Sequence, residues 1–223
     1  MSSDPGFERI NSRTLRNAVY QQLRERIISG KLTPGQSISL RSIAGQLGVS
    51  ISPVRDAVWQ LDSEKVLVVE SNKSIRVNSL DAEEMQEALR IRLLLEIQAA
   101  EMACELRSED DLPRIRSLLG SLNASIKKPK RYVELNSKYH FAIYSCARSP
   151  MLLGILNGLW ARIVPYFFLY VSNPEDLKKT VSFHTAMYEA VESRQKAKIV
   201  DALHRDLETA AALIIPILRE LNS

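Results

Sequence analysis

Residues 39–61 contain two short amphipathic helical patterns separated by one tight turn. The first follows Ser39, a favourable N-cap residue, ends at Gly48, and places apolar residues at helical spacing: Leu40, Ile43, Ala44 and Leu47. In the second, Ser52 is placed to cap a helix with Pro53 at its first position and an apolar face of Val54, Ala57, Val58 and Leu61. Two such helices joined by so short a turn predict a helix-turn-helix, whose second helix fits the DNA major groove.

The flanking segments extend this unit into a winged helix. Apolar residues recur at helical spacing from Thr14 to Ser29, and Gly30 supplies the stop. Two β-rich segments, 66–69 and 75–77, are separated by five polar residues and predict a hairpin. Lys73 near its tip would contact phosphate or the minor groove. We therefore expect a flexible arm over 1–13 and a winged helix-turn-helix over 14–78.

The exposed face of the second short helix is expected to carry Arg55, Asp56, Trp59 and Asp62. Arg55 lies in the first turn, which is the part of a recognition helix that enters the groove. A guanidinium there can pair with guanine O6 and N7 or hold phosphate. The alternative is a surface ion pair between Arg55 and Asp56 or Asp62.

Positive charge is concentrated in this same third of the chain. Residues 1–78 hold 11 Lys and Arg against 7 Asp and Glu, whereas residues 79–223 hold 19 of each. The whole formal excess of +4 therefore lies in the first part. This division is typical of a small module that binds a polyanion, attached to a neutral body.

Other sequence features disfavour secretion and membrane insertion. The two cysteines, Cys104 and Cys146, form neither a CxxC motif nor a disulfide-dense pattern, which favours a reducing cytoplasm. The N-terminus lacks the apolar segment of a signal peptide. The most apolar stretch, 152–171, is interrupted by Asn157, Arg162 and Pro165, which a buried core helix tolerates more easily than a bilayer span.

From residue 81 the pattern is helical to the end of the chain. Turn signals at 110–113, 128–129, 149–150 and 173–174 divide it into about six helices. The fold class expected is therefore mostly α: an N-terminal winged helix-turn-helix followed, over 79–223, by an antiparallel all-helical bundle.

The segment 19–69 resembles the winged helix-turn-helix of the GntR family of bacterial transcription regulators. The resemblance rests on GxLxPG at 30–35, LGVS at 47–50 and PVRxA at 53–57. It implies DNA contacts from Arg41, Ser50, Ser52 and Arg55, together with Lys73 of the wing. The sequence departs from the family where Ile51 replaces an arginine, and where Lys65 and Ser74 replace glycines before and within the wing.

The second part resembles the ligand-sensing FCD domain of the FadR subgroup. The matching segments are RxxxE at 92–96, AAEMA at 99–103 and NSKYHFAI at 136–143. This subgroup commonly holds a divalent metal through one Asp and three His. The resemblance places ligands at Asn136, His140 and His184, and at Asp206, where the family's spacing puts its last histidine. His204 is the less favoured alternative: it lies two residues earlier and about 200° around the helix, so the two cannot both serve.

The substituted ligand set leaves two interpretations open. Asparagine is a weak neutral ligand, so a His2Asp site helped by Asn136 would bind a divalent ion, Zn²⁺ being our choice, less tightly than the family pattern. In the other interpretation, His140 and His184 are hydrogen-bonded core residues beside a cavity.

The residues that would bind an effector also have two interpretations. The resemblance implies that Arg92 pairs with the carboxylate of a small organic acid. Alternatively, Arg92 forms an i, i+4 salt bridge with Glu96 and needs no ligand. Tyr166 can line the same pocket or belong to the core.

Together these features predict a cytoplasmic, homodimeric regulator that binds a near-palindromic double-stranded DNA operator, responds to a small carboxylate and does not associate with a membrane. Two apolar rows on the last helix suit a helix buried on both sides. The alternatives are a DNA-independent interaction module with a degenerate winged helix, and a metal-dependent helical-bundle enzyme. The enzyme is disfavoured because only one Asp-x-x-His pair and no catalytic motif is present.

Overall fold

The computed structural model describes residues 12–70, 74–169, 171 and 174–221. Its first unit is built on α1 (Ser12–Ile28), which packs across α3 (Ile51–Ser63). The core between these helices and the short strands is apolar and includes Val19, Leu23, Ile27, Val54, Ala57 and Leu61. Helix α1 begins two residues before the predicted Thr14, so only residues 1–11 of the expected arm lie outside the described part of the chain.

Helix α2 (Leu40–Leu47) has the predicted ends. The Ser39 side chain accepts a hydrogen bond of 3.2 Å from the Ser42 amide, and Gly48 adopts φ 65° at the C-cap. The predicted start of α3 is wrong: its N-cap is Ser50, and Ser52 and Pro53 lie inside the first turn. Proline is tolerated there because amides of the first turn have no partner within the helix.

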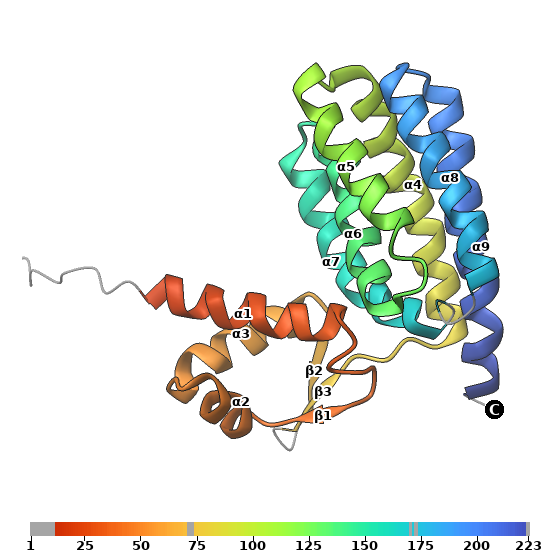
Figure 1. The fold of residues 1–223 in the computed structure, drawn as a ribbon. Coiled ribbons are helices and arrows are strands. Elements are labelled where there is room, and N and C mark those ends of the chain that lie inside the picture. Colours follow the sequence, from red (N-terminus) through yellow and green to blue (C-terminus); the bar gives the residue numbers. More distant parts are fainter. Residues whose placement is uncertain (1–11, 71–73, 170, 172–173, 222–223) are drawn as a thin grey trace, which may run out of the picture.

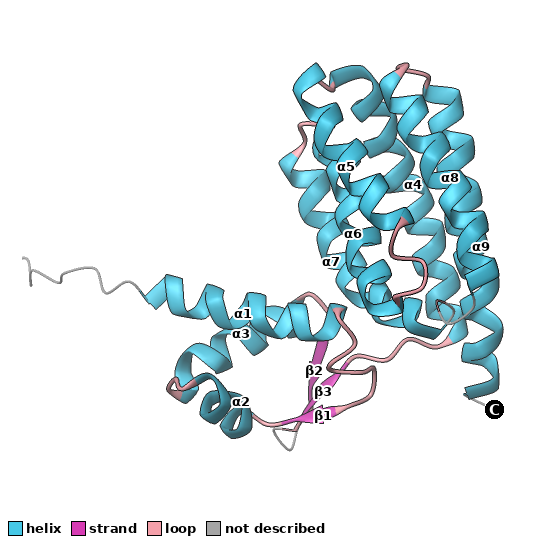
Figure 2. Cartoon of the chain, in the orientation of Figure 1, coloured by secondary structure: helices cyan, strands magenta, loops and turns pink. Residues whose placement is uncertain are grey.

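The wing is a three-stranded antiparallel sheet in the order β1-β3-β2. Strands β2 (Leu67–Val69) and β3 (Ile75–Val77) form the predicted hairpin, with Val68 opposite Arg76. The sequence did not predict β1 (Ser37–Ile38), because two residues are too few to show an alternating pattern. Figure 2 shows that these strands are confined to the smaller unit.

Lys65 and Ser74 stand where the family pattern has glycine, and the structure accommodates them in different ways. Lys65 has φ 57°, a left-handed conformation that a side chain disfavours. Ser74 instead uses its side chain, since its hydroxyl donates to Glu70 Oε2 over 2.6 Å at the base of the hairpin. Lys73 lies outside the described residues.

The second unit contains the six predicted helices in its described part. A capping box between Asp81 and Glu84 begins the first of them. In chain order the elements are α4 (Ala82–Leu106), the 3-10 turn η1 (Glu109–Asp111), α5 (Leu112–Asn123), α6 (Pro129–Ser145), α7 (Pro150–Ile163), the 3-10 segment η2 (Val164–Leu169), α8 (Pro174–Glu192) and α9 (Lys196–Leu221).

Helix α9 packs along both α4 and α8. The central residues of both its apolar rows are buried, so packing within the chain accounts for the two rows. The bundle core also contains four large aromatic residues with almost no exposure: Tyr132, Tyr139, Tyr144 and Trp160. Cys104 and Cys146 are buried and free, as expected for a chain without a disulfide.

The segment Pro150–Leu169 is long and apolar enough to pass a length and composition test for a membrane span. It carries Arg162, and 44% of the tested window is buried inside the protein. This segment is a core element of the bundle and does not indicate a membrane protein.

The two units meet where the C-terminal end of α1 approaches α7 and η2 (Figure 1). Arg24 donates to both the backbone and side-chain oxygens of Asn157, over 2.8 and 2.6 Å. Ala161 of α7 is fully buried in the core of the smaller unit. Gly30, at φ 68°, faces the ring of Phe168 so closely that an added Cβ would lie 2.9 Å from it.

Candidate functional site

One surface of α3 is accessible over the length of the helix. Ile51, Arg55 and Trp59 follow each other at i, i+4 and i+8, so they form one row. Ile51 and Trp59 are 37% and 58% exposed, although both are large and apolar. Asp62, expected on this face, is half-buried and accepts a hydrogen bond of 3.0 Å from the Val69 amide. It therefore anchors the hairpin to the helix.

Two of the cations expected to contact DNA, Arg41 and Arg55, make no ion pair within the described part of the chain. Arg41 and Arg55 are exposed, and within the described residues neither has an acidic group at ion-pair distance. The predicted alternative, a surface pair of Arg55 with Asp56 or Asp62, is thus not formed. Ser50 and Ser52 are exposed beside them, and the Ser50 side chain makes no capping bond. These positively charged and hydroxyl groups are available to an anionic partner.

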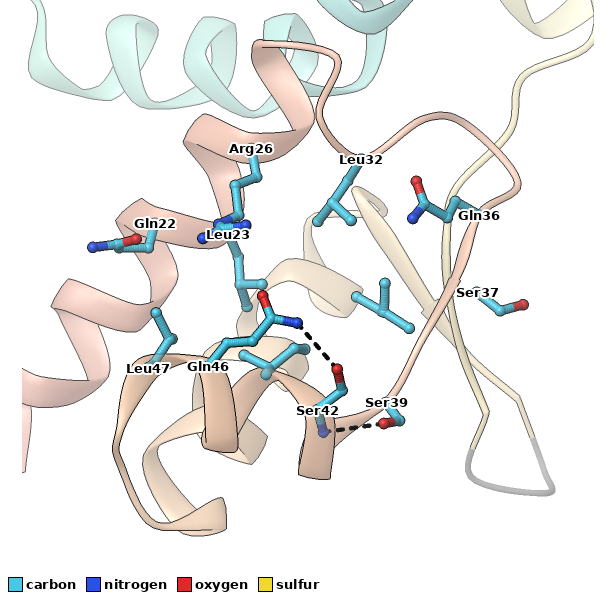
Figure 3. Close-up of a pocket in the computed structure, with 12 residues that line it drawn as sticks. Gln22, Leu23, Arg26, Leu32, Gln36, Ser37, Ser39, Ser42, Gln46 and Leu47 are labelled. Atoms are coloured by element: carbon cyan, nitrogen blue, oxygen red, sulfur yellow. Dashed lines mark hydrogen bonds between the residues drawn. The ribbon is translucent and has the colours of Figure 1, made fainter.

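A pocket of about 470 Å³ lies on another side of the same unit, between α1, α2 and the β1 segment (Figure 3). Its wall includes Ser42, which accepts a hydrogen bond from Gln46 and whose amide donates to Ser39. Seven of its twelve lining residues are polar, and Arg26 is the one that carries a charge. No sequence pattern predicted this pocket.

The bundle brings together three of the predicted metal ligands from three helices. His140 of α6 lies 3.2 Å from His184 of α8, measured between their Nε2 atoms. Asp206 of α9 is 3.4 Å from each imidazole through separate oxygens. All three side chains are buried. With one donor atom taken from each residue, the three donors lie within 4.8 Å of one another, so that a single ion with bonds of ~2.1 Å could be shared after small side-chain movements.

Hydrogen bonds behind His140 set its protonation. Tyr144 donates to Glu96 over 2.5 Å, so its oxygen accepts from Nδ1 of His140 at 3.0 Å. Burial raises the pKa of Tyr144 well above its usual value, which keeps this phenol a donor. With the proton on Nδ1, the Nε2 lone pair of His140 points at His184 and Asp206, as a metal ligand requires.

The charge state of the other two groups also suits a cation. Burial lowers the pKa of His184 to about 4, so its imidazole is neutral at pH 7. Burial opposes ionisation of Asp206, but the adjacent imidazoles of His184 and His140 and the charge of Arg92 together lower the pKa of this carboxyl. Imidazole nitrogens and a carboxylate are the donor types that Zn²⁺ takes, and the residues present therefore fit a divalent ion.

The two remaining predicted ligands, Asn136 and His204, lie in different surroundings. Asn136 is buried one helical turn before His140 on α6, on the side of the cluster. His204 points elsewhere: its side chain is 45% exposed and lies 3.1 Å from Glu208. Between the two alternatives on α9, only Asp206 lies in the cluster.

Arg92 sits beside this cluster and is already paired. Its Nε donates to Glu96 over 2.6 Å, both side chains are buried, and the guanidinium lies 4.7 Å from the ring centre of Trp160. Glu96 also accepts from the Trp160 indole at 2.8 Å and from Tyr144. Tyr166 lies apart from this network, with its hydroxyl accepting from the amide of Leu80 at 2.5 Å.

Sequence reasoning missed the roles of Tyr144 and Trp160. Tyr144 follows His140 at i+4, a spacing that allows contact on one helix face, but such pairs are too common to single out. Trp160 lies on α7, and no local sequence pattern predicts that α7 packs against α4. Both residues donate to Glu96, which pairs with Arg92, and Tyr144 also accepts from His140.

A winged helix-turn-helix joined to a six-helix bundle with a buried His-His-Asp cluster defines the class of helical-bundle, winged-helix regulators. A family model described as "Bacterial regulatory proteins, gntR family" matches residues 15–77, and one described as "FCD domain" matches residues 87–209. The chain belongs to the GntR family and carries an FCD domain. It is a transcription regulator, and its relatives are regulators rather than enzymes.

Relatives match over most of this chain. The HTH-type transcriptional regulator McbR of Escherichia coli (strain K12) is 29% identical over 196 residues, covering 86% of this chain and 89% of that protein. The gluconate operon transcriptional repressor of Bacillus subtilis (strain 168) is 25% identical over 197 residues, covering 85% and 81%. The solved structure of E. coli McbR/YncC superposes with a TM-score of 0.83 at 27% identity, covering 94% of this chain and 99% of that one.

Proposed function

We propose that the chain is a cytoplasmic, ligand-responsive regulator that binds a near-palindromic DNA operator as a homodimer. Residues 14–78 form the DNA-binding domain and residues 79–223 the sensing and dimerisation domain. The observation that carries the proposal is the exposed, unpaired Arg55 on the accessible face of α3, in a unit that holds all of the chain's net positive charge.

In this proposal α3 enters the major groove and Arg55 contacts a guanine edge or a phosphate. Arg41, Ser50 and Ser52 position the helix on the backbone, and Lys73 of the wing contributes a further phosphate contact. Ile51 replaces the arginine of the family pattern, and with Trp59 it places apolar surface on either side of Arg55. Apolar side chains in the groove contact thymine methyl groups, so this row favours A·T pairs next to the pair read by Arg55.

Dimerisation has structural support on α4. Leu94 is 74% exposed, and Ile91 lies one turn before it on the same face, also exposed. A second copy of the chain on this face would bury both. Two recognition helices related by a two-fold axis then read two half-sites about one helical turn apart.

The bundle would hold a divalent ion through His140, His184 and Asp206, with Asn136 as a helper. When bound, the ion supplies positive charge for an acidic effector. Arg92 is the second cation at this place, but Glu96 already satisfies it. A small carboxylate therefore binds Arg92 only by competing with Glu96. Because Trp160 donates to Glu96 and its ring lies against the Arg92 guanidinium, this competition repositions Trp160. Tyr166 contributes by holding Leu80, in the segment that connects the two units.

Regulation requires that the effector bind one arrangement of the two units more tightly than another. Trp160 and Ala161 are neighbours on α7, one beside Glu96 and the other in the core of the DNA-binding unit. A shift of α7 would therefore move residues both in the Glu96 network and in the core of the DNA-binding unit.

The proposal is tested by selecting bound fragments from genomic DNA and titrating the bound sequence at increasing salt. Specific DNA binding must weaken steeply with salt, because bound cations are released from phosphate. Binding in which the two half-sites are protected, with a strong salt dependence, supports the proposal. Failure to retain any fragment at low salt, or affinity that does not change with salt, would favour the DNA-independent interaction module.

A further inference from the structure

We propose that the cleft between the two units is a second small-molecule site, which binds an amphipathic anion with an apolar body and one anionic head. The cleft has a volume of about 760 Å³ and is bounded by α1 and the loop after it on one side and by α6 and α7 on the other. This site is separate from the His-His-Asp cluster and does not depend on the proposed metal.

The walls of the cleft carry an excess of positive charge. Six Lys or Arg residues line it against two Glu residues. Glu134 is already engaged by Arg131 and Lys138 at 2.9 and 2.5 Å. Among the described residues, four of the lining cations have no acid at ion-pair distance, and both units contribute to them: Arg24, Arg26, Lys31 and Lys130. The second acid, Glu25, is likewise unpaired, so the net charge of the walls stays positive.

Arg24 is half-buried in the wall of the cleft. Its Nη2 donates to Asn157, whereas its Nε is buried and finds no acceptor among the described residues. Burial lowers the pKa of this guanidinium, which shows that its charge is poorly solvated. The Arg24 charge has no anionic partner among the described residues, and an anion in the cleft would supply one beside the guanidinium.

The floor of the cleft is apolar. Phe141 and Val164 line it together with Ile28 and the edge of Trp160, and the rings of Phe141 and Trp160 are in edge contact with centres 5.5 Å apart. Such a floor favours a ligand with an aromatic or aliphatic body over an inorganic ion. Because Trp160 also contacts Arg92 and Glu96, occupancy of the cleft is transmitted to the interior network.

Two fluorescent probes of similar shape test the site: 8-anilinonaphthalene-1-sulfonate, which is an amphipathic anion, and the neutral N-phenyl-1-naphthylamine. The full-length protein is titrated with each, alongside Lys31→Gln on the DNA-binding side and Lys130→Gln on the bundle side. Neither lysine makes an ion pair in the described part of the chain, so both variants are expected to fold, which circular dichroism checks. Lys198→Gln, an exposed lysine on α9, is the control.

Each cleft variant is expected to raise the Kd of the sulfonate probe about 2- to 5-fold, and the double variant by roughly the product. Lys198→Gln should leave the Kd of the sulfonate probe unchanged. The neutral probe should bind more weakly, and its Kd should not change in any of the three variants. The proposal is overturned if only one wall matters, if the control changes the Kd as much as the cleft variants, or if the neutral probe binds as tightly as the sulfonate.

Discussion

Arg92 and Glu96 form an ion pair one helical turn apart on α4, with both side chains almost completely buried. An ion pair at this spacing on a helix surface contributes little, but here neither charge is solvated. Glu96 accepts further hydrogen bonds from Tyr144 and Trp160, so one carboxylate joins α4, α6 and α7. The pair therefore links three helices, and its carboxylate is also the group with which an acidic effector must compete for Arg92.

Replacing Glu96 by glutamine should strongly destabilise the fold. The substitution leaves the buried Arg92 charge uncompensated, and breaking a buried pair in this way costs about 3–5 kcal/mol. Urea unfolding followed by circular dichroism measures the change. Glu87→Gln, an exposed glutamate on the same helix, is the matched control and should change stability by less than about 0.5 kcal/mol. Equal stability of the two variants would mean that the Arg92–Glu96 pair does not stabilise the fold.

Arg55→Ala should weaken operator binding by about 1–3 kcal/mol if Arg55 contacts a base, and should relax sequence preference at that position. Fluorescence anisotropy with the selected operator and with a version changed at one base pair measures both effects. The control is Arg114→Ala, an exposed arginine on α5 of the bundle. Unchanged affinity of the Arg55 variant would remove this residue from the DNA contact.

Metal binding should depend on His140 and not on His204. Saturating Zn²⁺ at about 100 times its Kd should stabilise the wild-type protein by ~2.7 kcal/mol through mass action, and a chelator should reverse this. His140→Ala should lose the stabilisation, whereas His204→Ala should keep it, because His204 lies outside the cluster. Elemental analysis after dialysis gives an independent measurement. Equal zinc content in the two variants would contradict the site.

Lys65→Gly should stabilise the DNA-binding unit. Lys65 has φ 57°, where an L residue with a Cβ is strained by about 1–2 kcal/mol, partly offset by the greater freedom of glycine in the unfolded chain. A net gain of roughly 0.5–1 kcal/mol is expected, measured as a higher Tm. Lys65→Ala keeps the Cβ and separates loss of charge from relief of strain; an equal gain in both variants would refute the explanation.

Both cysteines should react slowly in the folded protein. Burial raises the pKa of the Cys104 and Cys146 thiols to about 11 each. At pH 8 such a thiol is about 100-fold less ionised than an ordinary one of pKa ~8.5, and the thiolate is the reactive form. Reaction with Ellman's reagent should therefore be at least about 100-fold slower than in 6 M guanidinium. A fast phase in the native protein would show that one thiol is accessible.

Local patterns in the sequence predicted most of the fold. The ends of α2, the hairpin of β2 and β3 and the six helices of the bundle follow from apolar spacing and from Ser, Gly and Pro at their boundaries. The start of α3 was missed because Ser50 and Ser52 are both favourable N-cap residues, so residue preference does not distinguish between them. Strand β1 is defined only by its pairing with β3, a contact distant in sequence.

The candidate sites were predicted to different extents. The row of Arg55 and Trp59 follows from helical periodicity, since the buried face of α3 fixes the exposed one. For the bundle, the resemblance favoured Asp206 over His204, although apolar rows pass through both positions. The contacts that hold Glu96 come from three helices, and no local rule pairs Tyr144 with Trp160.

Gly30 has consequences for recombining regulators of this kind. Its left-handed backbone and its contact with Phe168 each disfavour a side chain, and the two requirements come from different halves of the chain. A hybrid protein made by exchanging everything after residue 78 would inherit the glycine from one parent and the aromatic ring from the other. Such hybrids should assemble well only when both parents share this small-residue and ring combination, so the two halves are inherited as a matched set.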